Sequence, residues 1–130
     1  MRYLLDTDTV SFALRGQGDV GSRLRDQKPS DVSISAITVA ELRYGADRKG
    51  SRKLHALIDA FAAAVEVAAF DEQAAREFGR IGTHLADRGT PIGDFDVLIA
   101  AHAVALRRTL VTNNTRHFSK VPGLVMENWL

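Results

Sequence analysis

Short apolar segments alternate with longer helical segments along this chain. Four short segments are continuously apolar or alternate with period two, as buried strands do. They are Arg2–Leu5, Val32–Ser35, Val67–Phe70 and Thr109–Thr112. Longer segments with helical periodicity lie between and beside them at Ile37–Lys49, Ser51–Val65, Asp71–Arg88 and Asp94–Arg108. Short strands that alternate with helices predict an α/β sandwich around a mainly parallel sheet.

Length and composition narrow the class of protein. The chain has 130 residues, of which 45% are hydrophobic and none is cysteine. A chain of this size buries enough surface to fold as one domain, residues 1–130, without disulfides or structural zinc. No apolar run approaches the length of a membrane span, and the N-terminus does not resemble a signal peptide, so we expect a cytoplasmic protein. The formal net charge of +1 requires any affinity for nucleic acid to come from a local patch.

Polar side chains follow several of the predicted strands. Asp6 comes directly after the first strand, and Asn114 follows the last one. Glu41 lies about one and a half turns into the helix after the second strand. Asp96 lies in the first turn of the apolar helix Asp94–Arg108. Because ligands bind at the carboxyl ends of parallel strands, we expect these four side chains to gather at one edge of the sheet.

The acids in this group predict a metal site. Glu41 has apolar neighbours on the same side of its helix, namely Ile37 and Tyr44. It is therefore expected to lie on the stripe of the helix that faces the core. Carboxylates brought together repel one another and destabilise a fold unless a cation lies between them. Oxygen ligands without His or Cys favour Mg²⁺ or Mn²⁺.

Helix capping is an alternative use of the aspartates. Asp6 or Asp8 could cap the helix that follows the first strand. Asp94 is predicted to be a cap, because residues two apart on a helix point about 200° away from each other and cannot both face one ion. Asp96 is therefore the preferred ligand.

Two other residues have alternative structural uses. Glu41 could be a partly exposed helix residue paired with Arg43 or Arg48. Asn113 and Asn114 could form no more than a turn.

Four blocks of the sequence, taken in order, carry a family resemblance. They are Tyr3–Asp8, Ala40–Gly45, Ile92–Ala103 and Leu110–Asn114, the last followed by Phe118 and Pro122–Leu124. In order and spacing, these blocks resemble the PIN-domain ribonucleases of the VapC toxin type, from Met1 to Trp129.

The resemblance implies a PIN-like three-layer sandwich and a metal-dependent endoribonuclease. Such a protein is the toxin of a VapBC-type toxin–antitoxin pair, hydrolyses RNA, inhibits translation and growth, is typically dimeric, and is held inactive by a VapB-type antitoxin. By this likeness Asp6, Glu41 and Asp96 form the acidic triad. Asn114 falls where many PIN domains carry a fourth acid, which leaves a neutral oxygen ligand there.

The chemistry of phosphodiester hydrolysis suggests roles for these residues. Asp6 and Asp96 are expected to bind Mg²⁺ directly or through water, while Glu41 completes the metal shell or orients the attacking water. Thr7 and Thr112 are expected to hold the carboxylates through their hydroxyl groups.

A cluster of basic residues provides a candidate path for RNA. Between residues 41 and 55 positive charges exceed negative ones by three. The candidates are Arg43, Arg48, Lys49, Arg52 and Lys53, with a possible extension through Arg107, Arg108, Arg116 and Lys120. The alternative is an ordinary solvated helix face.

Parts of the sequence also resemble other functional classes. The segment Gly16–Gly21 matches a dinucleotide-binding fingerprint but follows a helical stretch, so it is predicted to be a loop. Asp6 and Asp8 also resemble the nucleophile and acid of haloacid-dehalogenase-like phosphatases, although the remaining motifs come in the wrong order. A catalytically inert PIN-like binding module is a third possibility.

Histidines and apolar helix faces complete the expectations. The four histidines contain no metal-binding pair at helical spacing, and His102 is expected to be a core or near-site residue. Apolar positions in Leu54–Phe61 and Ala74–Ile81 exceed what a small sheet covers, which predicts a homodimer or an antitoxin groove.

Overall fold

The computed structural model describes residues 2–130, so Met1, included in the predicted domain, lies outside the described residues. All strand pairs are parallel, in the order β3-β2-β1-β4-β5. The strands are β1 Tyr3–Leu5, β2 Val32–Ser35, β3 Glu66–Ala68, β4 Thr109–Val111 and β5 Met126–Glu127. The helices are α1 Thr7–Leu14, α2 Val20–Arg25, α3 Ala36–Lys49, α4 Arg52–Ala64, α5 Glu72–Asp87, α6 Asp94–Leu106 and α7 Thr115–Phe118, with a 3₁₀ turn at Pro29–Asp31.

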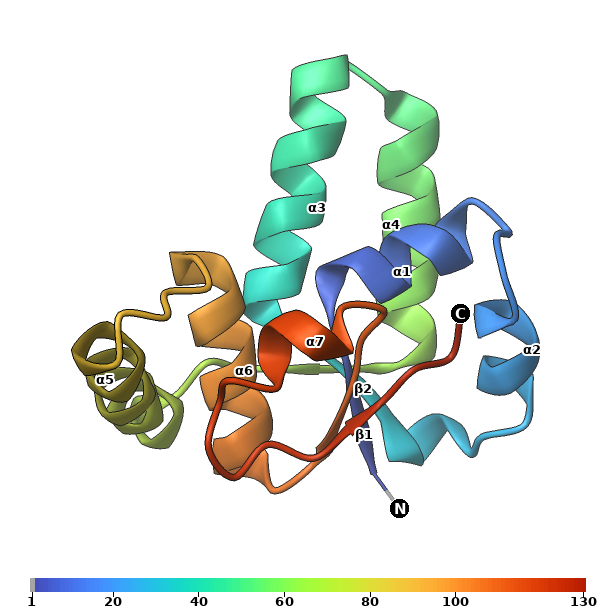
Figure 1. The fold of residues 1–130 in the computed structure, drawn as a ribbon. Coiled ribbons are helices and arrows are strands. Elements are labelled where there is room, and N and C mark those ends of the chain that lie inside the picture. Colours follow the sequence, from blue (N-terminus) through green and yellow to red (C-terminus); the bar gives the residue numbers. More distant parts are fainter. Residues whose placement is uncertain (1) are drawn as a thin grey trace.

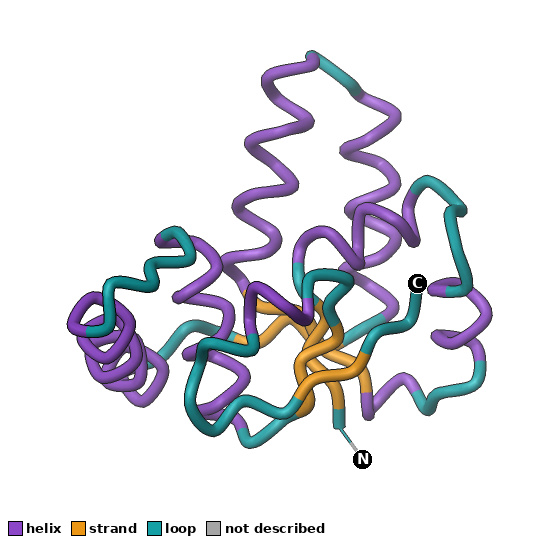
Figure 2. Tube along the Cα trace, viewed as in Figure 1, coloured by secondary structure: helices purple, strands orange, loops and turns teal. Residues whose placement is uncertain are grey.

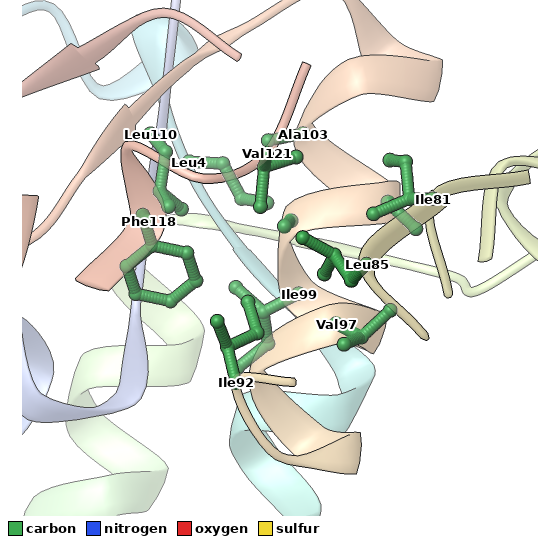
Figure 3. Packing of buried hydrophobic residues seen from close by; sticks show 12 residues of the cluster. Leu4, Ile81, Leu85, Ile92, Val97, Ile99, Ala103, Leu110, Phe118 and Val121 are labelled. Carbon is green, nitrogen blue, oxygen red and sulfur yellow. The ribbon is translucent and has the colours of Figure 1, made fainter. Parts of the chain in front are cut away.

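Helices cover both faces of the sheet, which confirms the predicted α/β sandwich with a parallel central sheet (Figures 1 and 2). Successive residues of a strand point to opposite faces, and β1 shows this directly. Leu4 packs into the cluster beneath α5 and α6, where Figure 3 shows it beside Leu110 and Phe118. Leu5 packs into the cluster beneath α1 to α4. The two clusters form the core on either side of the sheet.

The register of the sheet aligns the ends of its three central strands. Leu5 of β1 is paired with Ile34 of β2 and with Val111 of β4. The residues that follow these strands therefore emerge at one level, which is where the candidate acids are found.

Helices α3 and α4 form a hairpin that extends beyond the sheet (Figure 1). Gly50 ends α3 with φ 60°, a left-handed conformation that suits glycine. The Ser51 hydroxyl then accepts a hydrogen bond from the Leu54 amide and caps α4. The sequence thus places a sharp reversal between two long helices.

Several boundaries differ from the sequence-based prediction. Strand β3 spans Glu66–Ala68, not Val67–Phe70. The predicted loop Gly16–Gly21 is wrong at its end, because α2 begins at Val20, which is buried and anchors the helix to the core. Helix α7 and strand β5 were not predicted, since such short elements carry no periodicity.

The predicted apolar surfaces on α4 and α5 are largely used up inside the molecule. Ile58 of α4 is 1% exposed, and Ala74 and Ile81 of α5 are not exposed at all. Leu54 and Phe61 pack against the cluster beneath α1 to α4. The open apolar surface on these two helices is therefore smaller than predicted, and the homodimer and the antitoxin groove both stay predictions.

None of the helices within residues 2–130 combines the length and the apolar character that a membrane span requires.

Candidate active site

Asp6 is buried at the point where β1 ends and α1 begins. Its side chain is 4% exposed, and its Oδ1 accepts a hydrogen bond of 2.8 Å from the Thr9 amide, so Asp6 is the N-cap of α1. The Thr112 hydroxyl also hydrogen-bonds this carboxylate. Asp6 therefore does cap α1, as the capping alternative predicts, and it does so at the end of β1.

Glu41 reaches the same edge from α3. Its Oε1 accepts a hydrogen bond of 2.7 Å from the Thr7 hydroxyl, which also lies 3.1 Å from the Thr38 hydroxyl. These contacts of Thr7 with Thr38 and Glu41 therefore join the start of α1 to α3.

The predicted environment of Glu41 was wrong. The buried face of α3 is formed by Thr38, Leu42 and Ala46, at a spacing of four residues. Glu41 borders this face and is half-buried, while its neighbour Tyr44 is 69% exposed. No ion pair joins Glu41 to Arg43 or Arg48 among the described residues, because Arg43 bonds to Asp59 instead.

Asp96 lies in the first turn of α6 and contacts a histidine from α7. The Nε2 of His117 lies 3.0 Å from Asp96 Oδ2 and 2.8 Å from the Ile92 carbonyl oxygen. Both of these are acceptors, so Nε2 carries the proton and donates to them. His117 thereby ties Asp96 to the loop that precedes α6.

The expected capping role of Asp94 was wrong. Gly93 is the N-cap of α6, with φ 93°, and Asp94 is the first helical residue. A glycine reaches this backbone conformation without strain, so the chain turns into the helix without a side-chain cap.

The carboxylates lie close enough to influence one another. Burial raises the pKa of Asp6, of Glu41 and of Asp96 above their ordinary values. The negative charges of Asp96, Asp8 and Asp6 raise the pKa of Glu41 further, and Asp8 acts in the same direction on Asp6 and Asp96. Hydrogen bonds from Thr112, Thr7 and His117 oppose these effects. The structure therefore gathers the three predicted acids into one mutually repelling group, joined by Asp8.

Asn114 and Thr112 lie beyond the end of β4. The backbone N–H of Asn114 donates a hydrogen bond of 3.0 Å to the Thr112 hydroxyl, which also hydrogen-bonds the Asp6 carboxylate. Asn114 is exposed and precedes α7 without capping it through its side chain. Its side chain is therefore not engaged in holding the helix.

The donor atoms at this edge suit a hard divalent cation. Carboxylate, hydroxyl and amide oxygens are the ligands that Mg²⁺ and Mn²⁺ prefer, and a cation would relieve the repulsion that raises these pKa values. Within residues 2–130, however, no three His, Cys, Asp or Glu side chains lie in positions ready to hold a metal ion. The residue types fit the ion, but the side chains are not yet arranged as a complete ligand set.

The basic residues divide into two groups. Arg48, Lys49, Arg52 and Lys53 are all exposed and lie at the tip of the α3–α4 hairpin. Arg43 differs, because its guanidinium contacts the His55 ring and forms an ion pair with Asp59 of α4. Arg43 therefore braces the hairpin, and the expectation that it contacts RNA loses its basis.

Sequence reasoning missed His117, and it offered Asp8 only as an alternative helix cap or as the acid of a phosphatase. His117 lies 21 residues from Asp96, and only the packing of α7 against the start of α6 brings the two together. His102, by contrast, is fully buried and lies 2.8 Å from the Ser35 hydroxyl, as expected for a core residue. Burial lowers the pKa of His102, which keeps the ring neutral.

Comparisons with known proteins extend over nearly the whole chain. A PIN domain family model matches residues 3–124. The chain is 35% identical over 130 residues to the tRNA(fMet)-specific endonuclease VapC of Salmonella typhimurium, covering 99% of this chain and 98% of that protein.

Solved structures show the same likeness. The DNA-bound VapBC complex from Salmonella typhimurium contains a chain with a TM-score of 0.94 and 36% identity, matched over 100% of this chain and 99% of that one. The VapBC2 complex of Rickettsia felis, bound to a DNA fragment from its promoter, gives a TM-score of 0.91 and 32% identity, with 100% of both chains covered.

Proposed function

Because the chain belongs to the PIN-domain family and matches VapC ribonucleases along almost its entire length, we propose that it is a metal-dependent endoribonuclease and the toxin of a VapBC-type pair. The observation that carries this proposal is the group formed by Asp6, Glu41 and Asp96. Three acids whose pKa values are raised by burial, none paired with an arginine among the described residues, are unfavourable for folding. A bound cation and a phosphodiester substrate would explain why they are held together.

We propose that Asp6 and Asp96 would hold Mg²⁺ or Mn²⁺, with Glu41 and Asn114 able to contribute further oxygen atoms. The ion, when bound, would lower the pKa of a water molecule and neutralise charge that develops on the phosphate. Asp6 is kept in place by Thr9 and Thr112.

Glu41 is the residue best placed to orient the attacking water or accept its proton. Its Oε1 is engaged with the Thr7 hydroxyl, which leaves Oε2 for this purpose. The raised pKa of Glu41 makes it a better proton acceptor than an exposed glutamate. Thr7 thus acts as a positioning residue for Glu41.

RNA is proposed to approach along the hairpin. The four exposed cations at its tip lie roughly 10 Å or more along α3 from Glu41, given the rise of a helix. This distance allows them to contact phosphates that flank the cleaved bond without neutralising the acids. Because the Salmonella typhimurium relative is named for its action on tRNA(fMet), the initiator tRNA is the first RNA to test.

A VapB-type antitoxin is the proposed protein partner. An apolar cavity of about 220 Å³ lies between α2 and the end of α4, and its lining includes Leu24, Phe61 and Val65. Such a cavity suits the apolar side chains of an antitoxin segment. We further propose that the toxin acts in the cytoplasm and forms a homodimer, for which light scattering of the purified protein is the direct test.

The test is cleavage of RNA by the purified chain. We expect cleavage of the initiator tRNA in Mg²⁺ or Mn²⁺ and its loss in EDTA. Asp6→Asn, Glu41→Gln and Asp96→Asn should each lower the rate by about a thousandfold or more while leaving a folded protein. Asp26→Asn, which removes an exposed charge at the end of α2, is the matched control and should remain active.

One result of this experiment would change the proposed mechanism, and another would reject the proposed function. Full activity in a triad variant would remove that residue from the mechanism. A wild-type protein that binds its antitoxin but cleaves no RNA in either metal would be the inert binding module considered above. The phosphatase alternative is not supported, because the chain belongs to the PIN-domain family.

A further inference from the structure

A hollow next to the acids is lined by two aromatic side chains from distant parts of the sequence. Tyr44 comes from the middle of α3 and Phe95 from the first turn of α6, and together with Ala40 and Glu41 they line a cavity of about 460 Å³. The sequence separates the two rings by 51 positions, and only the packing of α3 beside α6 brings them together. Glu41 belongs to both this hollow and the candidate active site.

Both rings are unusually open to solvent. Tyr44 is 69% exposed and Phe95 is 54% exposed, whereas all seven of the other Phe, Tyr and Trp side chains are buried or half-buried. A large apolar side chain that is left in water forgoes the favourable free energy of burial. Exposed aromatic rings grouped in a hollow are a feature of binding sites.

We propose that Tyr44 and Phe95 form a stacking site for an unpaired nucleobase of the RNA substrate. This inference rests on the proposed nuclease function and adds a recognition element to it. A phosphodiester held at the carboxylates links two nucleotides, and each of them carries a base. One of those bases lies within reach of the hollow, since Glu41 forms part of its wall.

The chemistry of the hollow favours a base over an apolar peptide side chain. Flat aromatic faces bind any base by stacking, and single-stranded RNA is recognised largely in this way. Glu41 adds a carboxylate that can accept a hydrogen bond from a base amino group.

Charge on the same helix also favours RNA. Arg48 lies one turn beyond Tyr44 on α3, is exposed, and therefore stands where it can contact a phosphate of the same strand. An aromatic ring followed by a cation one turn later is the arrangement expected for a base and its neighbouring phosphate.

The site predicts that the enzyme acts on unpaired RNA. A base in a regular duplex is stacked on its neighbours and cannot enter the hollow, whereas a base in a loop or a single strand can. Cleavage within a loop of a folded RNA should therefore exceed cleavage of the same sequence in a duplex.

The experiment compares binding of two strands with equal charge. One is a short labelled single-stranded RNA of mixed sequence, and the other is a strand of the same length built from abasic ribose phosphate. Binding is measured in an Asp96→Asn background, which prevents cleavage. Tyr44→Ala and Phe95→Ala should each weaken binding of the RNA by about 5- to 100-fold and leave binding of the abasic strand unchanged.

Three further variants make the result specific. Tyr44→Phe and Phe95→Tyr retain a stacking face and should bind RNA like the parent protein. Val125→Ala removes another exposed apolar side chain, 63% exposed and outside this hollow, and should also bind like the parent. Thermal melting of each variant verifies the fold, which substitutions at exposed positions should not disturb.

Several outcomes would overturn the proposal. Equal RNA binding by the parent and both alanine variants would show that the rings do not stack a base, while leaving the nuclease function intact. Alanine variants that bind RNA normally but change the oligomeric state, or lose only the antitoxin, would assign the hollow to a protein interface. Failure of the wild type itself to bind or cleave RNA would remove the proposed function, and this inference with it.

Discussion

At the scale of single residues, Asp6 is both the N-cap of α1 and one of the three acids gathered at the candidate active site. Asp6 caps α1 through Oδ1, and its charge also raises the pKa of Glu41 at the candidate active site. Asparagine caps helices about as well as aspartate, so Asp6→Asn removes the buried charge and keeps the cap. This substitution therefore separates the electrostatic effect of Asp6 from its structural one.

We expect Asp6→Asn to raise the thermal midpoint by about 2–5 °C at pH 7 in the absence of metal. Burial raises the folded-state pKa of Asp6 above its ordinary value of 3.8. Because the folded state favours the protonated carboxyl group, this group contributes its full stability when the pH is below the unfolded-state pKa. The contribution is lost as the pH rises through the folded-state pKa. The advantage of the variant should therefore disappear near pH 3.

Thermal melts between pH 3 and pH 8 measure this difference. Asp26→Asn serves as the control, since its exposed charge should change the midpoint little at any pH. A variant less stable than the wild type at pH 7 would show that Asp6 stabilises the fold as an anion, contrary to the pKa argument.

Sequence patterns identified the three acids but not the contacts that hold them. Asp6 and Asp96 could be selected because they lie where a strand ends and where a buried helix begins, and Glu41 because its helical neighbours are apolar. The proximity of His117 to Asp96, and of Tyr44 to Phe95, depends on how α3, α6 and α7 pack. Such contacts between distant segments leave no periodicity in one sequence, so they could not be predicted from it.

At the scale of elements, long helices and central strands could be predicted, and short peripheral elements could not. Strand β2 and helix α3 have a clear period and a defined cap or glycine at their ends. Strand β5 has only two residues and forms because β4 offers a free edge beside it. Its existence depends on tertiary structure, which local patterns do not contain.

The segment after β5 shows how such a short element is secured. The Trp129 ring packs edge-on against Tyr3 of β1, with ring centroids 4.8 Å apart, and is 1% exposed. Its Nε1 donates a hydrogen bond of 3.0 Å to Glu127, which also pairs with Arg23 of α2 at 3.2 Å. One indole thus links β5, β1 and α2.

Trp129→Ala should destabilise the protein by about 3–5 kcal/mol, because it empties a buried site of ring size. Urea unfolding measures the loss, and Leu130→Ala, which removes a partly exposed neighbour, should lose far less. Trp129→Phe should recover part of the stability by refilling the site. Equal stability of wild type and Trp129→Ala would mean that the tail does not hold β5 in solution.

At the scale of the whole molecule, charge is separated between the acid group and the hairpin tip. The net charge is only +1, yet four exposed cations lie together at the turn between α3 and α4. A local cluster of this kind can attract a polyanion even though the protein as a whole is nearly neutral.

Neutralising Arg48, Lys49, Arg52 and Lys53 to glutamine should weaken RNA binding and flatten its dependence on salt. The slope of log K against log salt is expected to fall by roughly 0.7 for each lost phosphate contact to a single strand. Titrations at several salt concentrations measure the slope. Replacing four other exposed arginines is the matched control and should leave the slope close to that of the wild type; they are Arg25 of α2, Arg76 and Arg80 of α5, and Arg88, which follows α5.

An unchanged slope in the hairpin variant would assign its cations to solubility. A similar loss in both variants would mean that RNA responds to total charge and not to this patch.

The two outer strands limit how other chains can join this molecule. β3 has three residues and β5 only two, so each offers too few unpaired amides and carbonyls for an incoming segment to prolong the sheet. Recognition by backbone pairing, the route that many peptide-binding domains use, is thereby closed at both margins. Partners must instead be selected by side chains, on the helices and in the hollows between them.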